Sequence, residues 1–188
     1  MRAFAWLAAT LIAALAQTAL AADKFVLKSA AIAPNAKIAD IHVFNGFGCE
    51  GGNVSPALEW SGAPAGTKSF AVTMYDPDAP TGSGWWHWVV FNIPVSNTKL
   101  EQGAGDAGGA RLPAGAVQSR TDFGGPGYGG PCPPKGPSLK KPHRYTFTVF
   151  ALKVDKLELG PESSGALVGY MLNANALGKA SFTGLYGR

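Results

Sequence analysis

The amino-acid sequence predicts a mainly β fold that ends in a single helix. Three segments, 70–75, 89–93 and 144–152, are rich in β-branched and aromatic residues and are bounded by turn formers, which is typical of strands. The 25 glycines and 14 prolines indicate that much of the chain forms turns and irregular loops. Residues 164–177 are the one stretch whose apolar residues recur at helical spacing.

Composition and charge narrow the class of protein. Of the 188 residues, 46% are hydrophobic and 15% are charged, which is the composition of a packed globule rather than of a disordered chain. The net charge of +4 is mild. The basic cluster between Lys135 and Arg144 is interrupted by a glycine and two prolines, so it forms no helix face. We therefore expect no nucleic-acid partner, and a small anion fits the charge better.

Residues 1–21 have the features of a secretory signal peptide. A short basic start precedes an apolar run over residues 3–16, and Ala19-Leu20-Ala21 matches the small-residue pattern of a cleavage site. We expect cleavage after Ala21, a periplasmic or secreted location, and a single domain formed by residues 22–188. An uncleaved membrane anchor is the alternative, but no second apolar run of about 18 residues follows, so no stable span is expected after cleavage.

Export would place the two cysteines in an oxidising compartment, where an even number of cysteines favours a disulfide. We therefore predict a disulfide between Cys49 and Cys132, with two buried thiols as the alternative. Two cysteines at this spacing do not match a zinc site, and we predict neither a metal site nor a cofactor.

The elements that precede the central strands are short. Residues 25–28 are a strand candidate, and residues 40–44 alternate in polarity like a strand that carries His42 on its surface. The glycine-rich loop 45–56 that follows has neither of the glycine patterns that hold nucleotide phosphates.

The elements that follow the central strands differ in character. Residues 95–130 form a long, weakly structured region, which predicts a functional or mobile segment. The proline-rich loop 131–136 is rigid enough to form a pocket wall. Helix 164–177, with Ser164 as a candidate cap, is expected to pack one apolar face on the core. That face consists of Leu167, Tyr170, Met171, Ala174 and Leu177. Residues 182–186 form a last short strand or a packed tail.

The connection between the first two central strands carries the residues that point most strongly to a site. Two prolines stiffen it, so Asp76 and Asp78 are expected to lie in an extended segment and to point to the same side. His87 follows where the chain re-enters the sheet, among tryptophans that can exclude water. A solvated Asp-Pro turn beside a structural histidine is the alternative.

Several motifs occur in the order of a known protein family. They are Asp76-Pro77-Asp78-Ala79-Pro80, Trp86-His87-Trp88, Gly130-Pro131-Cys132-Pro133-Pro134-Lys135-Gly136 and His143-Arg144-Tyr145, with Asn53-Val54-Ser55-Pro56 before them and Gly184-Leu185-Tyr186-Gly187-Arg188 at the end. On these motifs the chain resembles the phosphatidylethanolamine-binding protein family, and more closely its bacterial Raf-kinase-inhibitor-like branch. The resemblance covers roughly the whole of residues 22–188.

The resemblance implies a fold and a binding site. The implied fold is a β-sandwich of two antiparallel sheets, with a C-terminal helix and a small anion-binding pocket at one end. The family's pocket residues map onto Asp76, Asp78, His87, Pro134, His143 and Tyr145, and no catalytic residue is implied. The loop around Cys132 carries extra residues relative to the family pattern, so the width of the pocket and the identity of the ligand stay open.

The implied pocket suits a small anionic or zwitterionic ligand that carries phosphate, such as a phosphoethanolamine-like group. Imidazoles donate hydrogen bonds to phosphate oxygens. Carboxylates repel a phosphate dianion, unless the ligand carries an ammonium group or a proton is shared. We expect tighter binding near about pH 5 to 6, where histidines gain charge.

Two other classes of function stay open. Two aspartates and two histidines could bind a metal or act as acid and base, which would make the protein a phosphate-ester hydrolase, although no HExxH or GxSxG motif is present. Some relatives of the resembled family are protease or kinase inhibitors, so a secreted inhibitor that acts through the loop 95–130 is the third option. The oligomeric state is open, with a homodimer as one option.

Overall fold

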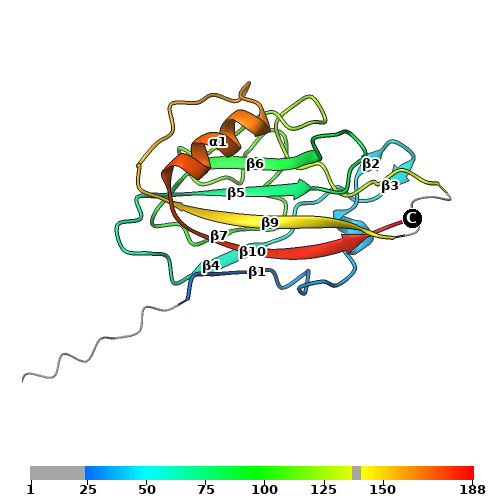
Figure 1. The fold of residues 1–188 in the computed structure, drawn as a ribbon, viewed down its shortest axis with the longest axis horizontal. Helices are drawn as coiled ribbons and strands as arrows, with labels where there is room; N and C mark the ends of the chain where they lie inside the picture. The colour runs from blue at the N-terminus through cyan, green and yellow to red at the C-terminus, as the bar shows by residue number, and fades with distance from the viewer. Residues whose placement is uncertain (1–23, 137–140) are drawn as a thin grey trace, which may run out of the picture.

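The computed structural model describes residues 24–136 and 141–188 (Figure 1). The predicted signal peptide lies outside these ranges, and within them no helix is long and apolar enough to cross a membrane. The elements in chain order are β1 (Val26–Lys28), a 3₁₀ turn (Asp40–His42), β2 (Asn45–Gly46), β3 (Cys49–Glu50), β4 (Leu58–Ser61), β5 (Ser69–Asp76), β6 (Trp85–Pro94), β7 (Lys99–Leu100), β8 (Val117–Gln118), β9 (His143–Leu152), α1 (Gly165–Asn175) and β10 (Ala176–Tyr186).

The largest sheet forms the frame of the molecule, with five strands in the order β10-β9-β5-β6-β8. Figure 1 shows its four long strands side by side. A smaller sheet has the order β1-β4-β7, and β2 pairs with β3 in a separate ribbon. All of these pairings are antiparallel. The predicted mainly β fold of antiparallel sheets with a C-terminal helix is therefore confirmed.

The core lies on both faces of the large sheet. On one face the small sheet packs against it, and the ring of Trp60 on β4 meets Phe70 on β5 with centroids 5.4 Å apart. On the other face α1 contacts β6 and β9, where Phe91, Leu152 and Leu172 are buried. Burying such a side chain stabilises the fold by about 1.5–3 kcal/mol relative to leaving it exposed.

Helix α1 forms where it was predicted but buries a different face. Ser164 caps it, since its hydroxyl accepts a hydrogen bond from the backbone N–H of Leu167 at 3.2 Å. The buried residues are Gly165, Val168, Gly169 and Leu172. The predicted core residues Leu167 and Tyr170 are exposed instead. The indole of Trp86 explains the difference, because it lies so close to the helix that a Cβ at Gly165 would overlap it.

The predicted strand over residues 40–44 is absent: residues 40–42 form a 3₁₀ turn, and His42 is buried rather than on the surface. The Nδ1 of His42 donates a hydrogen bond to the Val54 carbonyl at 2.6 Å. The Tyr128 hydroxyl donates to the His42 carbonyl at 2.8 Å. The alternating polarity of residues 40–44 is a local signal that favours a strand. It carries no information about the contacts with the distant residues Val54 and Tyr128, which bury His42.

The region 95–130 is a hydrogen-bonded series of turns with two short strands, β7 and β8. The Nε1 of Trp88 donates to Gln118 Oε1 at 2.6 Å, and the Gln118 amide donates to the Asp106 carbonyl at 2.7 Å. The backbone N–H of Gly105 donates to Ser55 Oγ at 2.9 Å. These hydrogen bonds order a region for which the sequence predicted little regular structure.

Gly130 allows the chain to pass close to residues 42–44 before it reaches the proline-rich loop. A Cβ at this position would overlap the His42 carbonyl and lie 2.6 Å from the Phe44 nitrogen, and both are backbone atoms that cannot turn aside. We expect Gly130→Ala to lower the free energy of unfolding by about 2 kcal/mol, measured by urea unfolding. Gly125→Ala is the matched control, because a Cβ there meets no atom within 4 Å. Equal stability of the two variants would contradict this close approach.

Candidate functional site

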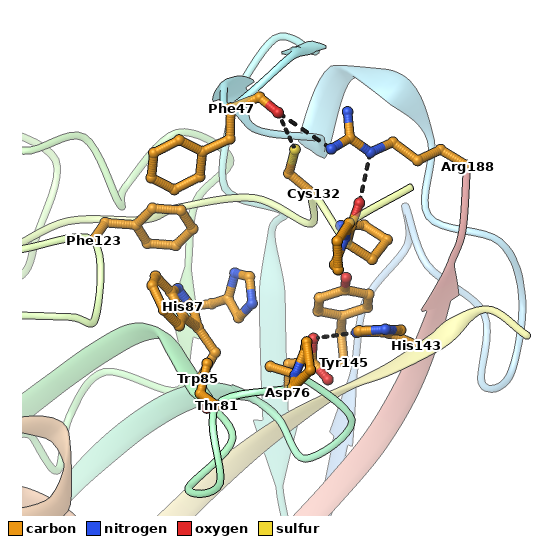
Figure 2. Close-up of a pocket in the computed structure, with 14 residues that line it drawn as sticks. Phe47, Asp76, Thr81, Trp85, His87, Phe123, Cys132, His143, Tyr145 and Arg188 are labelled. Atoms are coloured by element: carbon orange, nitrogen blue, oxygen red, sulfur yellow. Dashed lines mark hydrogen bonds and ion pairs between the residues drawn. The ribbon is translucent and has the colours of Figure 1, made fainter. Parts of the chain in front are cut away.

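One end of the large sheet holds a cavity of about 330 Å³ (Figure 2). Three strands form its floor, since β5 ends at Asp76, β6 begins at Trp85 and β9 begins at His143. Because β5 lies between β6 and β9, antiparallel pairing brings these three strand ends to one edge of the sheet. His87 on β6 and Tyr145 on β9 come two residues further along their strands, so they share a face with the first residues.

The cavity brings together five of the six residues that the resemblance assigned to the pocket. They are Asp76, His87, Pro134, His143 and Tyr145. Figure 2 shows the two histidines on opposite sides of Tyr145, one from β6 and one from β9. Asp76 and His143, which are 67 positions apart in the sequence, therefore line the same cavity.

His87 is buried, and its Nδ1 lies 2.7 Å from the carbonyl oxygen of Gly129. Because a carbonyl only accepts, Nδ1 carries the proton, and the neutral ring presents Nε2 as an acceptor. Burial lowers the pKa of His87 from 6.5 to about 4, against the opposing effect of the nearby Gly129 and Gly130 carbonyls. The predicted gain of charge by the histidines near about pH 5 to 6 therefore does not hold for His87.

Asp76 and His143 form a buried hydrogen-bonded pair. Their side chains are 3% and 5% exposed, and His143 Nδ1 lies 2.8 Å from one oxygen of the Asp76 carboxylate. The other oxygen accepts a hydrogen bond from the backbone N–H of Asp78 at 2.8 Å. The carboxylate thus orients the imidazole by accepting a hydrogen bond from Nδ1. The Nε2 of His143 is the ring atom left for a ligand.

Tyr145 lies between the two histidines. Its ring centroid is 5.1 Å from that of His87, with the rings nearly perpendicular, and 6.4 Å from that of His143. Tyr145 is fully buried, and its hydroxyl has no hydrogen-bond partner in the described part of the chain. Burial raises the pKa of Tyr145, so the hydroxyl keeps its proton and is a donor. A buried donor of this kind is costly unless a ligand supplies the acceptor.

Asp78 is the exception, because it does not line the cavity. Its carboxylate accepts two hydrogen bonds from the Arg144 guanidinium, at 2.7 and 2.9 Å, and a third from the Arg144 backbone N–H. The hydrogen bond from Arg144 lowers the pKa of Asp78. The two aspartates do not point to the same side, since β5 ends at Asp76 and a turn follows, so strand alternation no longer applies.

Loops from distant parts of the chain close the cavity opposite the sheet. The predicted disulfide between Cys49 and Cys132 is present and ties the loop 45–50 to the proline-rich loop 131–136. The guanidinium of Arg188 lies near Cys132 and joins the same two loops (Figure 2). It donates hydrogen bonds to the carbonyls of Phe47, Gly48 and Pro133, at 3.2, 2.7 and 2.6 Å.

Comparison with known proteins agrees with this architecture. The family described as phosphatidylethanolamine-binding protein matches residues 28–187 of the chain. The chain belongs to this family. It is 59% identical over 165 residues to UPF0098 protein YbcL of Escherichia coli K12, with 88% of each protein covered. It is also 51% identical over 150 residues to UPF0098 protein YbhB of the same organism, which covers 80% of this chain and 92% of YbhB.

Solved structures of phosphatidylethanolamine-binding protein relatives share the fold. The crystal structure of E. coli YbcL, described as a new member of the mammalian PEBP family, aligns with a TM-score of 0.84 at 58% identity. That alignment covers 87% of this chain and 98% of YbcL. The homolog CT736 from Chlamydia trachomatis aligns with a TM-score of 0.71 at 27% identity, over 87% of this chain and 97% of CT736. The fold that the resemblance implied is therefore confirmed.

Sequence reasoning missed two parts of this phosphatidylethanolamine-binding protein site. The first is Arg188, which the resemblance noted without a role. The second is an aromatic wall of Phe47, Trp85 and Phe123, in which Phe123 lies 5.4 Å from Trp85 and 5.3 Å from His87 between ring centroids. Both phenylalanines stand beside glycines in irregular loops, and that placement is the only hint in the sequence that they face a cavity.

Proposed function

We propose that this phosphatidylethanolamine-binding protein family member holds a small phosphate-bearing group in the cavity. The observation that carries the proposal is the Tyr145 hydroxyl, a buried donor that has no acceptor among the described residues. Phosphate oxygens are strong acceptors and would satisfy it. His143, which is oriented by its hydrogen bond to Asp76, lines the same cavity and has its Nε2 as a second polar atom for the ligand.

Asp76 also limits the charge that the ligand can carry. A carboxylate repels a phosphate dianion, and this cost falls when the ligand carries an ammonium group, as phosphoethanolamine does, or when the phosphate keeps a proton. The aromatic wall of Phe47, Trp85 and Phe123 offers apolar surface to the rest of the ligand. The proposed ligand is therefore a phosphate monoester or a zwitterionic head group rather than bare dianionic phosphate.

We also propose that the protein is exported to the periplasm or secreted. Two features support this location. Residues 1–21 have the composition of a signal peptide, and the Cys49–Cys132 disulfide is typical of an oxidising compartment. Detection of the mature chain, starting at Ala22, in an exported fraction would test the proposal.

A hydrolase is the second candidate, because a carboxylate that orients a histidine is an arrangement that general bases use. The Asp76–His143 pair has this form. In residues 24–136 and 141–188, no group of three or more His, Cys, Asp and Glu side chains is placed to hold a metal ion. A phosphomonoester turnover assay on the wild type and on His143→Gln separates binding from catalysis, since an enzyme would turn over substrate and the variant would lose that turnover.

A pair of buried tyrosines tests the proposed function. Tyr145→Phe should weaken binding of ethyl phosphate or phosphoethanolamine at least about tenfold, because a hydrogen bond to a charged group contributes about 1.5–3 kcal/mol. The same variant should raise the free energy of unfolding of the ligand-free protein, since it removes a buried hydroxyl that has no partner in the described residues. Isothermal titration calorimetry and urea unfolding measure the two quantities.

Tyr128→Phe is the matched control and should show the reverse result. Its hydroxyl lies away from the cavity and donates to the His42 carbonyl. We expect it to lose about 1 kcal/mol of stability while it keeps wild-type affinity. Wild-type affinity in Tyr145→Phe would refute the phosphate assignment.

A further inference from the structure

His87 and Tyr145 present opposite hydrogen-bonding groups to the same small space. The bond from His87 Nδ1 to the Gly129 carbonyl leaves Nε2 as an acceptor, and no described residue donates to it. The Tyr145 hydroxyl is a donor without an acceptor in the described part of the chain. Both residues line the cavity and their ring centroids are 5.1 Å apart, so we infer that one small ligand can reach both polar atoms.

A phosphate dianion satisfies only one of these two groups. All of its free oxygens are acceptors, so it can take the hydrogen bond from Tyr145 but would set an oxygen lone pair against the Nε2 lone pair of His87. A phosphate monoester that keeps one proton has both a P–O–H donor and phosphoryl acceptors. That is the combination the two side chains require.

The charged and titratable groups around the cavity favour the same form. From β5, the Asp76 carboxylate faces the site and meets a monoanion at lower electrostatic cost than a dianion. From β9, His143 donates a hydrogen bond from Nδ1 to the Asp76 carboxylate, so that its Nδ1–H is not available to the ligand. Arg188 is a cation of the cavity lining, but its guanidinium donates to three loop carbonyls. Burial lowers the pKa of His87 to about 4, so its ring stays neutral where phosphate monoesters lose their second proton, near about pH 6.

We propose that the cavity selects the singly protonated form of a phosphate monoester, whose P–O–H group donates to His87 Nε2 while a phosphoryl oxygen accepts from Tyr145. The inference rests on the proposed function and adds the protonation state of the ligand. In this arrangement the proton belongs to the ligand. His87 stays neutral and accepts the hydrogen bond from the P–O–H group.

Ligands that lose their second proton at different pH values test this assignment. Binding of ethyl phosphate should be constant between about pH 5 and 6, where His87 is neutral, and should weaken about tenfold for each pH unit above 6, because only the protonated fraction of the ligand binds. The onset of weakening should move to higher pH for ethylphosphonate, which holds its proton more strongly. It should move to lower pH for the difluoromethylene phosphonate analogue, which holds it less strongly. Ethyl sulfate has no such proton and should bind at least about tenfold more weakly throughout.

The variant His143→Gln separates a proton on the ligand from a proton on the protein. Glutamine keeps a donor toward Asp76 but does not titrate, so the variant should keep the ligand-dependent onset. An onset that is identical for the three phosphorus ligands, or a pH dependence that vanishes in His143→Gln, would overturn the inference while phosphate binding stands. If none of the three binds at any pH, the proposed function fails and this inference fails with it.

Discussion

Reduction of the Cys49–Cys132 disulfide is expected to lower the free energy of unfolding by about 4 kcal/mol. The bond spans 83 residues, and opening a loop of that length returns about this much chain entropy to the unfolded state. Urea unfolding with and without a reductant measures the effect as a shift of the midpoint. Phosphate binding should weaken as well, because Cys132 and the prolines that follow it line the cavity.

The double variant Cys49→Ala, Cys132→Ala is the control for the reductant. It should be about as unstable as the reduced wild type, and adding reductant should not change it further. A loss of less than about 1 kcal/mol in both cases would mean that the hydrogen bonds of Arg188, rather than the disulfide, hold the two loops together.

Acidification is expected to remove about 3 kcal/mol of stability through His87 alone. The pKa of His87 is about 4 in the folded protein, below the ordinary value of 6.5. As the pH falls, the unfolded chain therefore takes up this proton before the folded protein does. The stabilising contribution is complete above pH 6.5 and is lost progressively as the pH falls toward 4. The difference between the two pKa values corresponds to about 3 kcal/mol.

The variant His87→Phe isolates this contribution, because it keeps a ring and removes the titrating group. Its absolute stability will differ, since the Gly129 carbonyl loses a donor, so the measured quantity is the slope of unfolding free energy against pH. We expect a shallower slope than in the wild type between pH 4 and 6.5. Parallel curves for the two proteins would contradict a buried neutral His87.

The central strands could be predicted from the sequence because their signal is local. Runs of β-branched and aromatic residues between turn formers need no knowledge of the rest of the chain. The predicted segments 70–75, 89–93 and 144–152 lie within β5, β6 and β9, and each observed strand is longer than its predicted segment. The segment 182–186 is likewise the end of a longer strand, β10, which follows directly on the helix.

The face that helix α1 buries could not be predicted, because apolar residues occur on more than one side of it. Gly165 and Gly169 have a low intrinsic preference for helix, and this alone would mark them as weak points of the helix. In the structure they are the surface that accepts the indole of Trp86. The buried face of the helix is therefore determined by contact with Trp86 on β6, and the helical spacing of apolar residues does not predict that contact.

The polar floor of the site was predicted through the family resemblance, and the proline-rich loop and the disulfide were also predicted, whereas Arg188 and the aromatic wall were not. Spacing alone does not show that Asp76 and His143 meet, because that contact depends on the order of strands in the sheet. Arg188 binds backbone carbonyls, and every residue carries one, so no pattern of side chains marks its partners. Asp78 was misplaced because the alternation of a strand was extended into a turn.

The floor and the rim of the cavity are free to diverge at different rates during evolution. Asp76, His143 and Tyr145 belong to paired strands, where inserting one residue would turn the following side chains to the opposite face. The loops 45–50 and 131–136 have no place in that pairing, so they can change in length as long as their covalent bridge survives. Relatives that share this fold can thus keep the arrangement of Asp76, His143 and Tyr145 while the loops around the cavity change in length.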